Sequence, residues 1–197
     1  MTFQQATRDD AEAIACVVTQ TGEGLVEHIL DGLVPGVSGA VILSATFMKG
    51  EGIYRTDNVI RSRQGEHLSS LLFSYPSNEH RISTLMESLV PAKRLLGVRP
   101  ILERSVPDSL YINTFWVEEH PQDSGCADAL MAVAESRCRD MGYTKISLFC
   151  WNDNAGDLRF YTRQGFTVTE HIRMEKALLE RHPDGGSILC KELREEH

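Results

Sequence analysis

The order of strand and helix patterns between residues 111 and 172 constrains the fold more than any other feature of the sequence. Tyr111 to Val117 is rich in aromatic and β-branched residues, which is typical of a strand. Apolar residues then recur at helical spacing from Ala127 to Met141, and a glycine follows, as expected after a helix. The alternation continues with a strand over 145–151, a helix over 154–164 and a strand over 167–172. This order predicts one central sheet covered by helices.

The rest of the chain supplies further elements to the same mixed α/β (α+β) architecture. A short strand is expected over 3–7, followed by a helix that opens at Arg8, and Ser187 to Leu193 is expected as a terminal strand. Further helices are expected over 25–33, 37–48, 82–89 and 92–96, and a glycine-turned hairpin over 58–63 and 68–75. The length of 197 residues suits a single domain over 1–197.

Charge and composition exclude several classes of protein. The net charge is −8, and the lysines and arginines are scattered, so no nucleic-acid partner is expected. The N-terminus lacks a signal-peptide pattern, and no apolar stretch approaches the roughly 20 residues that span a bilayer. We therefore expect a cytoplasmic protein without a membrane partner. The five cysteines and seven histidines show no metal-ligand spacing, so we expect buried free thiols and no metal.

The segment between the strand at 111–117 and the helix at 127–141 carries the clearest chemical signal. It contains Gln122-Asp-Ser-Gly125-Cys-Ala127, in the pattern Q-x-x-G-x-A. A glycine-containing turn that enters a helix presents backbone N–H groups and the positive end of the helix dipole, which together suit a phosphate or pyrophosphate. Neither G-x-G-x-x-G nor G-K-[ST] is present, so the turn is not a dinucleotide fingerprint or a Walker loop.

With the following residues, this turn resembles the GCN5-related N-acetyltransferase (GNAT) family, whose pyrophosphate loop reads Q/R-x-x-G-x-G/A. Val117 stands five residues before Gln122, as in that family. Leu148, Cys150 and Asn154 follow L-x-V-x-x-x-N, and Tyr161 with Gly165-Phe166 completes N-x-x-x-x-x-x-Y-x-x-x-G-F. The resemblance covers residues 110–170. It implies a single mixed, mostly antiparallel sheet of about seven strands with helices on both faces and a V-shaped opening between the central strands.

The resemblance also implies where acetyl-CoA, the expected co-substrate, would bind. The peptide groups of Phe115 and Val117 would pair with the pantetheine arm, as in strand addition. Asn154 and Tyr161 would lie near the thioester. The backbone N–H groups that would hold the pyrophosphate belong to Gln122, Asp123, Ser124, Gly125, Cys126, Ala127 and Asp128.

Acetyl transfer requires a neutral amine, a polarised thioester carbonyl and a proton for the departing thiolate. Tyr161 is the candidate acid because a phenol with a pKa near 10 is protonated at neutral pH, although it could instead pack on the Gly165-Phe166 turn. Family members often carry a base on the strand where this chain has Tyr111 and Asn113, and neither is a usual base. The sequence leaves open a water relay, a substrate amine that arrives neutral, or a base at Glu118, Glu170 or His171.

Two residues depart from the family pattern, and the acceptor is not specified. Asp123 places a negative charge in the pyrophosphate loop, and Asp157 stands where the family often has alanine.

The segments 22–56 and 77–108 are interpreted as substrate-side insertions. We expect a small-molecule amine as acceptor, with a peptide or protein amine second. The alternatives are a non-catalytic acyl-CoA-binding or regulatory module and a partner-binding domain without a CoA site. Dimers are common in this family, so a homodimer is one expected state.

Overall fold

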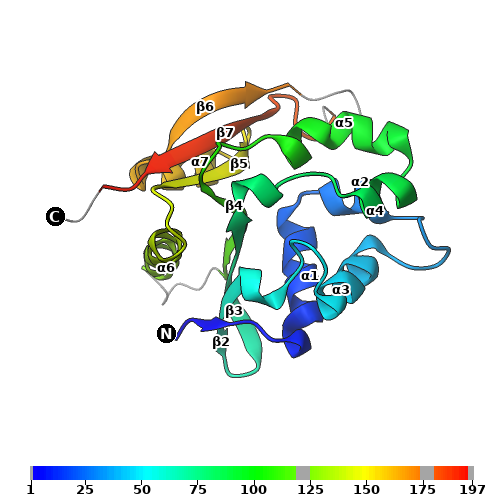
Figure 1. The fold of residues 1–197 in the computed structure, drawn as a ribbon, viewed down its shortest axis with the longest axis horizontal. Coiled ribbons are helices and arrows are strands. Elements are labelled where there is room, and N and C mark those ends of the chain that lie inside the picture. Colours follow the sequence, from blue (N-terminus) through cyan, green and yellow to red (C-terminus); the bar gives the residue numbers. More distant parts are fainter. Residues whose placement is uncertain (1, 119–124, 174–179, 195–197) are drawn as a thin grey trace. The chain divides into compact units, whose positions relative to one another are not determined.

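Seven strands form one hydrogen-bonded sheet in the computed structural model, which describes residues 2–118, 125–173 and 180–194. The strand order is β1-β2-β3-β4-β5-β7-β6. The strands are β1 (Gln4–Gln5), β2 (Val59–Gln64), β3 (His67–Pro76), β4 (Leu110–Val117), β5 (Lys145–Trp151), β6 (Thr167–Ile172) and β7 (Gly186–Glu192) (Figure 1). The β4–β5 pair is parallel, whereas β1–β2, β2–β3, β5–β7 and β6–β7 are antiparallel. The predicted mixed, mostly antiparallel sheet is confirmed.

The helices agree with the sequence pattern except at a few ends. They are α1 (Ala11–Thr21), α2 (Leu25–Leu30), α3 (Gly39–Lys49), α4 (Thr84–Leu89), α5 (Ala92–Glu103), α6 (Cys126–Asp140) and α7 (Ala155–Arg163). The strand expected over 3–7 shortens to β1, and Arg8–Asp10 forms a 3₁₀ turn before α1. The helix expected over 92–96 instead continues through Pro100, because Leu95, Val98 and Ile101 keep one buried face along it.

The chain divides into two compact units, and the first comprises Met1–Ser74 and Asn113–Ser136. In this unit α1 packs against α2 and α3. The ring of Phe47 lies edge-on to the rings of Tyr54 and Phe73, with centroids 5.4 Å away in each case, and both phenylalanines are fully buried. Gly65 turns the β2–β3 hairpin with a φ of 64°, a value that glycine adopts without steric cost. The expected hairpin is confirmed.

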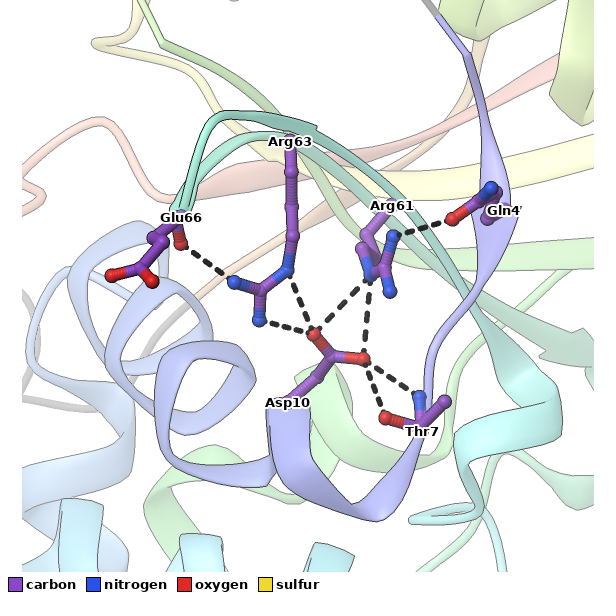
Figure 2. A network of polar contacts seen from close by, with 6 residues as sticks. All are labelled: Gln4, Thr7, Asp10, Arg61, Arg63 and Glu66. Carbon is purple, nitrogen blue, oxygen red and sulfur yellow. Dashed lines mark hydrogen bonds and ion pairs between the residues drawn. The ribbon is translucent and has the colours of Figure 1, made fainter.

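A buried ion-pair network joins the start of α1 to β2 in the first unit (Figure 2). Asp10 is 1% exposed and accepts hydrogen bonds from Arg63 Nη2 at 2.6 Å and from Arg61 Nε at 3.2 Å. Its Oδ2 also accepts the backbone N–H of Thr7 at 2.7 Å. Burial alone would raise the pKa of Asp10, but the bonds from Thr7 and Arg63 and the charge of Arg61 outweigh it and lower that pKa. The network therefore stabilises the ionised carboxylate.

The second unit comprises Tyr75–Ile112 and Arg137–His197, and a buried histidine organises one part of it. His80 Nε2 donates to the backbone oxygen of Ile101 at 2.8 Å, which leaves Nδ1 to accept from the Tyr75 hydroxyl at 3.1 Å. The imidazole also stacks on the ring of Tyr111 at 3.8 Å between centroids. Burial lowers the pKa of His80 from 6.5 to about 4, because the charged form would lose its hydration. His80 therefore stays neutral while it connects α5, β3 and β4.

Candidate active site

Tyr161 lies on α7, in the second unit, as a buried side chain that is 7% exposed. Its ring meets Phe166 edge-on at 5.5 Å, and the backbone N–H of Phe166 donates to the Tyr161 carbonyl at 3.0 Å. Burial raises the pKa of the phenol well above 10.0, and the charges of Asp157 and Cys150 raise it further. The phenol is therefore protonated at neutral pH and can act as a proton donor. The packing on Phe166 that the sequence offered as an alternative is also present.

Asn154 caps the N-terminus of the same helix. Its Oδ1 accepts the backbone N–H of Asp157 at 3.1 Å. This bond satisfies one of the amides of the first helical turn that have no partner within the helix. Its backbone carbonyl accepts from Leu158 at 3.1 Å. These contacts fix where α7 begins, and thereby the position of Tyr161 almost two turns further on.

The expected cofactor-binding residues at the end of β4 and the start of α6 lie in the first unit. Phe115, Val117 and Glu118 are half-buried, and the Glu118 N–H donates to the backbone oxygen of Ser69 at 2.9 Å. Gly125 has a φ of 100°, and a Cβ built there would meet no atom of the described residues within 4 Å. A side chain at this position would be disfavoured by the backbone conformation and not by crowding.

The helix that follows Gly125 has the polarity that an anion site needs. The Gly125 carbonyl accepts the N–H of Ala129 at 2.9 Å, so the regular helical bonding of α6 starts there. In this first turn Cys126 is buried, Ala127 is half-buried and Asp128 is exposed. Gln122, Asp123 and Ser124 lie outside the described residues. The amides of the first turn of a helix point out of its N-terminal end, where the helix dipole is positive.

The two residues expected at the base position of β4 differ in their surroundings. Tyr111 is 3% exposed and stacks on His80, and burial raises the pKa of its phenol above the usual range. Tyr111 is therefore part of the core of the second unit, and its catalytic role stays a prediction. Asn113 is exposed, and its side-chain oxygen accepts from the Thr114 hydroxyl at 3.1 Å.

A polar cluster at the end of β5 was not anticipated from the sequence. The imidazole of His182 lies flat on the indole of Trp151, with centroids 3.8 Å apart, and its Nδ1 is 3.0 Å from a carboxylate oxygen of Asp153. Beside this pair, Asn152 and Ser187 are joined by a hydrogen bond of 2.7 Å, and the Ser187 hydroxyl contacts His171 Nδ1 at 2.9 Å. The partners lie 16 to 35 positions apart in the chain, so no local motif signals them.

The structure also bears on metal binding, membrane spans and the cysteines. Within the described residues, no group of three or more His, Cys, Asp or Glu side chains could hold a metal ion. No helix in the described part of the chain has the length and apolar character to cross a membrane. Four cysteines are buried free thiols as expected, but Cys16 is exposed, which corrects that prediction because it lies on the outer side of α1.

Comparison with known proteins assigns the fold and the family. The family model described as Acetyltransferase (GNAT) family matches residues 67–166, just over half of the chain. The matched region includes Gly125, Asn154 and Tyr161. The chain therefore belongs to the GNAT acetyltransferase family, as the sequence motifs predicted.

Solved structures agree on the fold across nearly the whole chain. An N-acetyltransferase from Staphylococcus aureus Mu50 has a TM-score of 0.70 at 17% identity, and the alignment covers 96% of this chain and 100% of that one. A protein described only as an acetyltransferase has a TM-score of 0.68 at 16% identity over 98% and 100%. The PaiA N-acetyltransferase from Thermoplasma acidophilum, solved with coenzyme A, has a TM-score of 0.52 at 10% identity over 97% and 98%. No curated protein matches the sequence.

Proposed function

We propose that this protein is an N-acetyltransferase that moves an acetyl group from acetyl-CoA to an amine, with a small-molecule amine as the acceptor. The observation that carries the proposal is the family match over residues 67–166, which contains both the turn before α6 and Tyr161. Family structures solved with coenzyme A support the choice of co-substrate.

In the proposed reaction, residues of the first unit bind the cofactor. The diphosphate of acetyl-CoA would be held by backbone amides of the turn from Gln122 to Asp128, where the start of α6 supplies a positive dipole end. Gly125 supports this role because its positive φ is a conformation that glycine adopts freely and because a glycine lets an anion approach the backbone closely. The peptide groups of Phe115 and Val117 would bind the pantetheine arm.

The chemical step is direct attack of the amine in a ternary complex. The nitrogen lone pair of a neutral amine forms a bond to the thioester carbonyl carbon, and the carbon–sulfur bond then breaks. The thiolate of CoA takes the phenolic proton of Tyr161, and the proton lost by the new amide nitrogen restores the phenol. Tyr161 can fill this role because its phenol is protonated at neutral pH. Asn154 serves as a positioning residue by fixing the start of α7.

The test is release of free thiol from acetyl-CoA by the purified chain with a panel of small amines and peptides. The wild-type protein should release thiol with at least one amine. Tyr161→Phe should lower kcat by about 10²-fold or more while leaving the affinity for CoA intact, since general acid catalysis contributes that much. Tyr143→Phe provides a matched control, because Tyr143 is a half-buried tyrosine in the turn after α6.

Two other results would each replace the proposal with a different function. Thermal stabilisation by CoA without thiol release for any amine would identify a non-catalytic acyl-CoA-binding module. A protein whose melting temperature CoA does not change would have no CoA site, since a ligand at 100 times its Kd adds about 2.7 kcal/mol to stability.

A further inference from the structure

A chain of hydrogen bonds at the end of β5 fixes which nitrogen of His171 carries the proton. Asn152 Nδ2 lies 2.8 Å from the backbone oxygen of Asp184, an atom that can only accept, so the amide group must be oriented with its NH₂ toward Asp184. Its Oδ1 consequently faces Ser187, 2.7 Å from the hydroxyl oxygen. Because Oδ1 is only an acceptor, Ser187 must donate its single proton to Asn152.

The Ser187 hydroxyl in turn fixes the proton position on the imidazole of His171. Ser187 Oγ has no second proton to give, so its contact of 2.9 Å with His171 Nδ1 requires the imidazole to be the donor. The neutral imidazole therefore carries its proton on Nδ1, and its lone pair lies on Nε2. Ser187 is fully buried whereas His171 is exposed, so an internal anchor holds a side chain at the surface of the second unit.

A bulge in β6 places His171, and not its neighbour Glu170, against Ser187. Val168 pairs with Leu189, but the register shifts before Glu170, which pairs with Ile188, so that His171 pairs with Ser187. Without the extra residue, Glu170 would face Ser187 and His171 would point to the opposite face of the sheet. The bulge is therefore what brings the imidazole into the hydrogen-bond chain.

The register also places His171 in one row with Cys150 on β5. Cys150 on β5 pairs with Ser187, and Ser187 pairs with His171, so the three side chains share one face of the sheet over two strand spacings, about 10 Å. Cys150 is also among the groups that raise the pKa of Tyr161. Cys150 and the exposed imidazole of His171 therefore lie at opposite ends of one row within the second unit.

We propose that His171 is the general base of the acetyl transfer, accepting a proton from the acceptor amine at Nε2 directly or through one water. This proposal rests on the acetyltransferase function proposed above. An N–H bond of the substrate ammonium breaks, its proton passes to Nε2, and the freed lone pair attacks the thioester carbon. Tyr161 then protonates the thiolate as described. The imidazolium is exposed and returns its proton to solvent, which balances the overall release of one proton.

Several titratable side chains lie near His171 in the second unit. Its neighbour Glu170 forms an ion pair with Arg104, at the end of α5. Other titratable residues among those that the structure describes here are Cys150 in the same row, Asp184 beside Asn152, and His182 with Asp153, which pair with each other. Ser187 and Asn152 act as positioning residues, because they set the tautomer without reaching the substrate.

The kinetic test compares the pH profile of kcat/KM for wild-type protein and His171→Gln, using an amine that the wild type acetylates. Wild type should lose activity as the pH falls, because a general base acts only in its unprotonated form. His171→Gln should lower kcat/KM about 10²-fold and lose this acidic limb, because glutamine cannot take a proton. Imidazole added to His171→Ala should restore part of the rate. His67→Gln, an exposed histidine on β3, should behave as wild type.

The outcomes separate this proposal from the function on which it rests. Absence of thiol release from the wild type with every amine removes both. An active wild type together with an unchanged rate or an unchanged acidic limb in His171→Gln overturns the base role alone. Nitrogen NMR of the histidine rings gives an independent readout: wild type should show the Nδ1–H tautomer of His171, and Ser187→Ala a mixture. An Nε2–H tautomer in the wild type would refute the hydrogen-bond chain.

Discussion

Asn154 and Asp157 bind each other twice at the start of α7. The Asn154 Oδ1 accepts the backbone N–H of Asp157 at 3.1 Å, and its Nδ2 donates to the Asp157 carboxylate at 3.0 Å. An acidic side chain in the first turn also complements the helix dipole. Asp157, which departs from the alanine common in the family, therefore strengthens a cap and also helps to raise the pKa of Tyr161.

Substitution of Asn154 separates its capping role from contact with the cofactor. Asn154→Ala should destabilise the protein by about 1 kcal/mol, because it removes the cap of α7. Asn154→Ser keeps an oxygen that can accept from Asp157, so its urea unfolding midpoint should stay near that of wild type. If Asn154 acts only through the cap, Asn154→Ser also keeps the rate of acetyl transfer. A large loss of rate in this stable variant would instead assign Asn154 a contact with acetyl-CoA.

The sequence predicted the fold well where the pattern is periodic and local. The strand over 145–151 and the strand over 167–172 were predicted with the ends that the structure shows, because their apolar and β-branched residues are bounded by turn residues. The length of α5 was underestimated: the helix expected to end at residue 96 continues through Pro100, a residue that ordinarily ends a helix, with Leu95, Val98 and Ile101 buried along it.

The candidate site was predicted only in part, because some of its features are local in the sequence and others arise only in the assembled fold. Tyr161 could be named because it lies in a local motif. The tautomer of His171 could not be predicted, because it depends on contacts with Ser187 and Asn152. These contacts arise only when β5, β7 and the bulge of β6 are assembled. The burial of Tyr111 likewise depends on His80, which lies 31 positions earlier in the chain.

The low pKa of His80 predicts that stability falls in mild acid. In the unfolded chain His80 binds a proton near pH 6.5, whereas in the folded protein it does so only near pH 4. Lowering the pH between these values therefore favours the unfolded state. The free energy of unfolding should fall by about 2 kcal/mol from pH 7 to pH 5 through this residue. Urea unfolding at several pH values measures the slope.

The matched variants for this effect are His80→Gln and His67→Gln. His80→Gln should be less stable at pH 7 and show a much flatter slope between pH 7 and 5. His67→Gln, which alters an exposed histidine, should keep the wild-type slope. An unchanged slope in His80→Gln would show that another group causes the acid sensitivity.

The Asp10 network predicts a loss of stability when its charge is removed. Asp10→Asn leaves Arg61 and Arg63 without the carboxylate that they share, and should cost about 2 kcal/mol at pH 7. Asp9→Asn changes an exposed neighbour and should alter stability by less than about 0.5 kcal/mol. The pKa of Asp10 is lowered, so its contribution is present above the ordinary pKa of 3.8 and is lost as the pH falls below it. Equal unfolding midpoints for the two variants would contradict this account.

Two buried glycines should respond in opposite directions to the same substitution. A Cβ at Gly186, the first residue of β7, would lie 2.2 Å from the ring of Phe149 and 3.0 Å from the Cys150 carbonyl. Gly186 pairs with both Trp151 and Ile172, so β7 cannot shift there without disturbing two ladders. Gly186→Ala should therefore destabilise the protein by about 2 kcal/mol.

At Gly97, within α5, the same Cβ meets no atom of the part of the chain that the structure describes within 4 Å, and the backbone is helical. Gly97→Ala should stabilise the protein by about 0.5 to 1 kcal/mol, because alanine reduces the freedom of the unfolded chain and favours the helix. Denaturant unfolding of both variants under identical conditions measures the difference in sign. A stable Gly186→Ala protein would mean that the Phe149 ring can move aside, and the start of β7 would then be a less rigid support for Ser187 and His171.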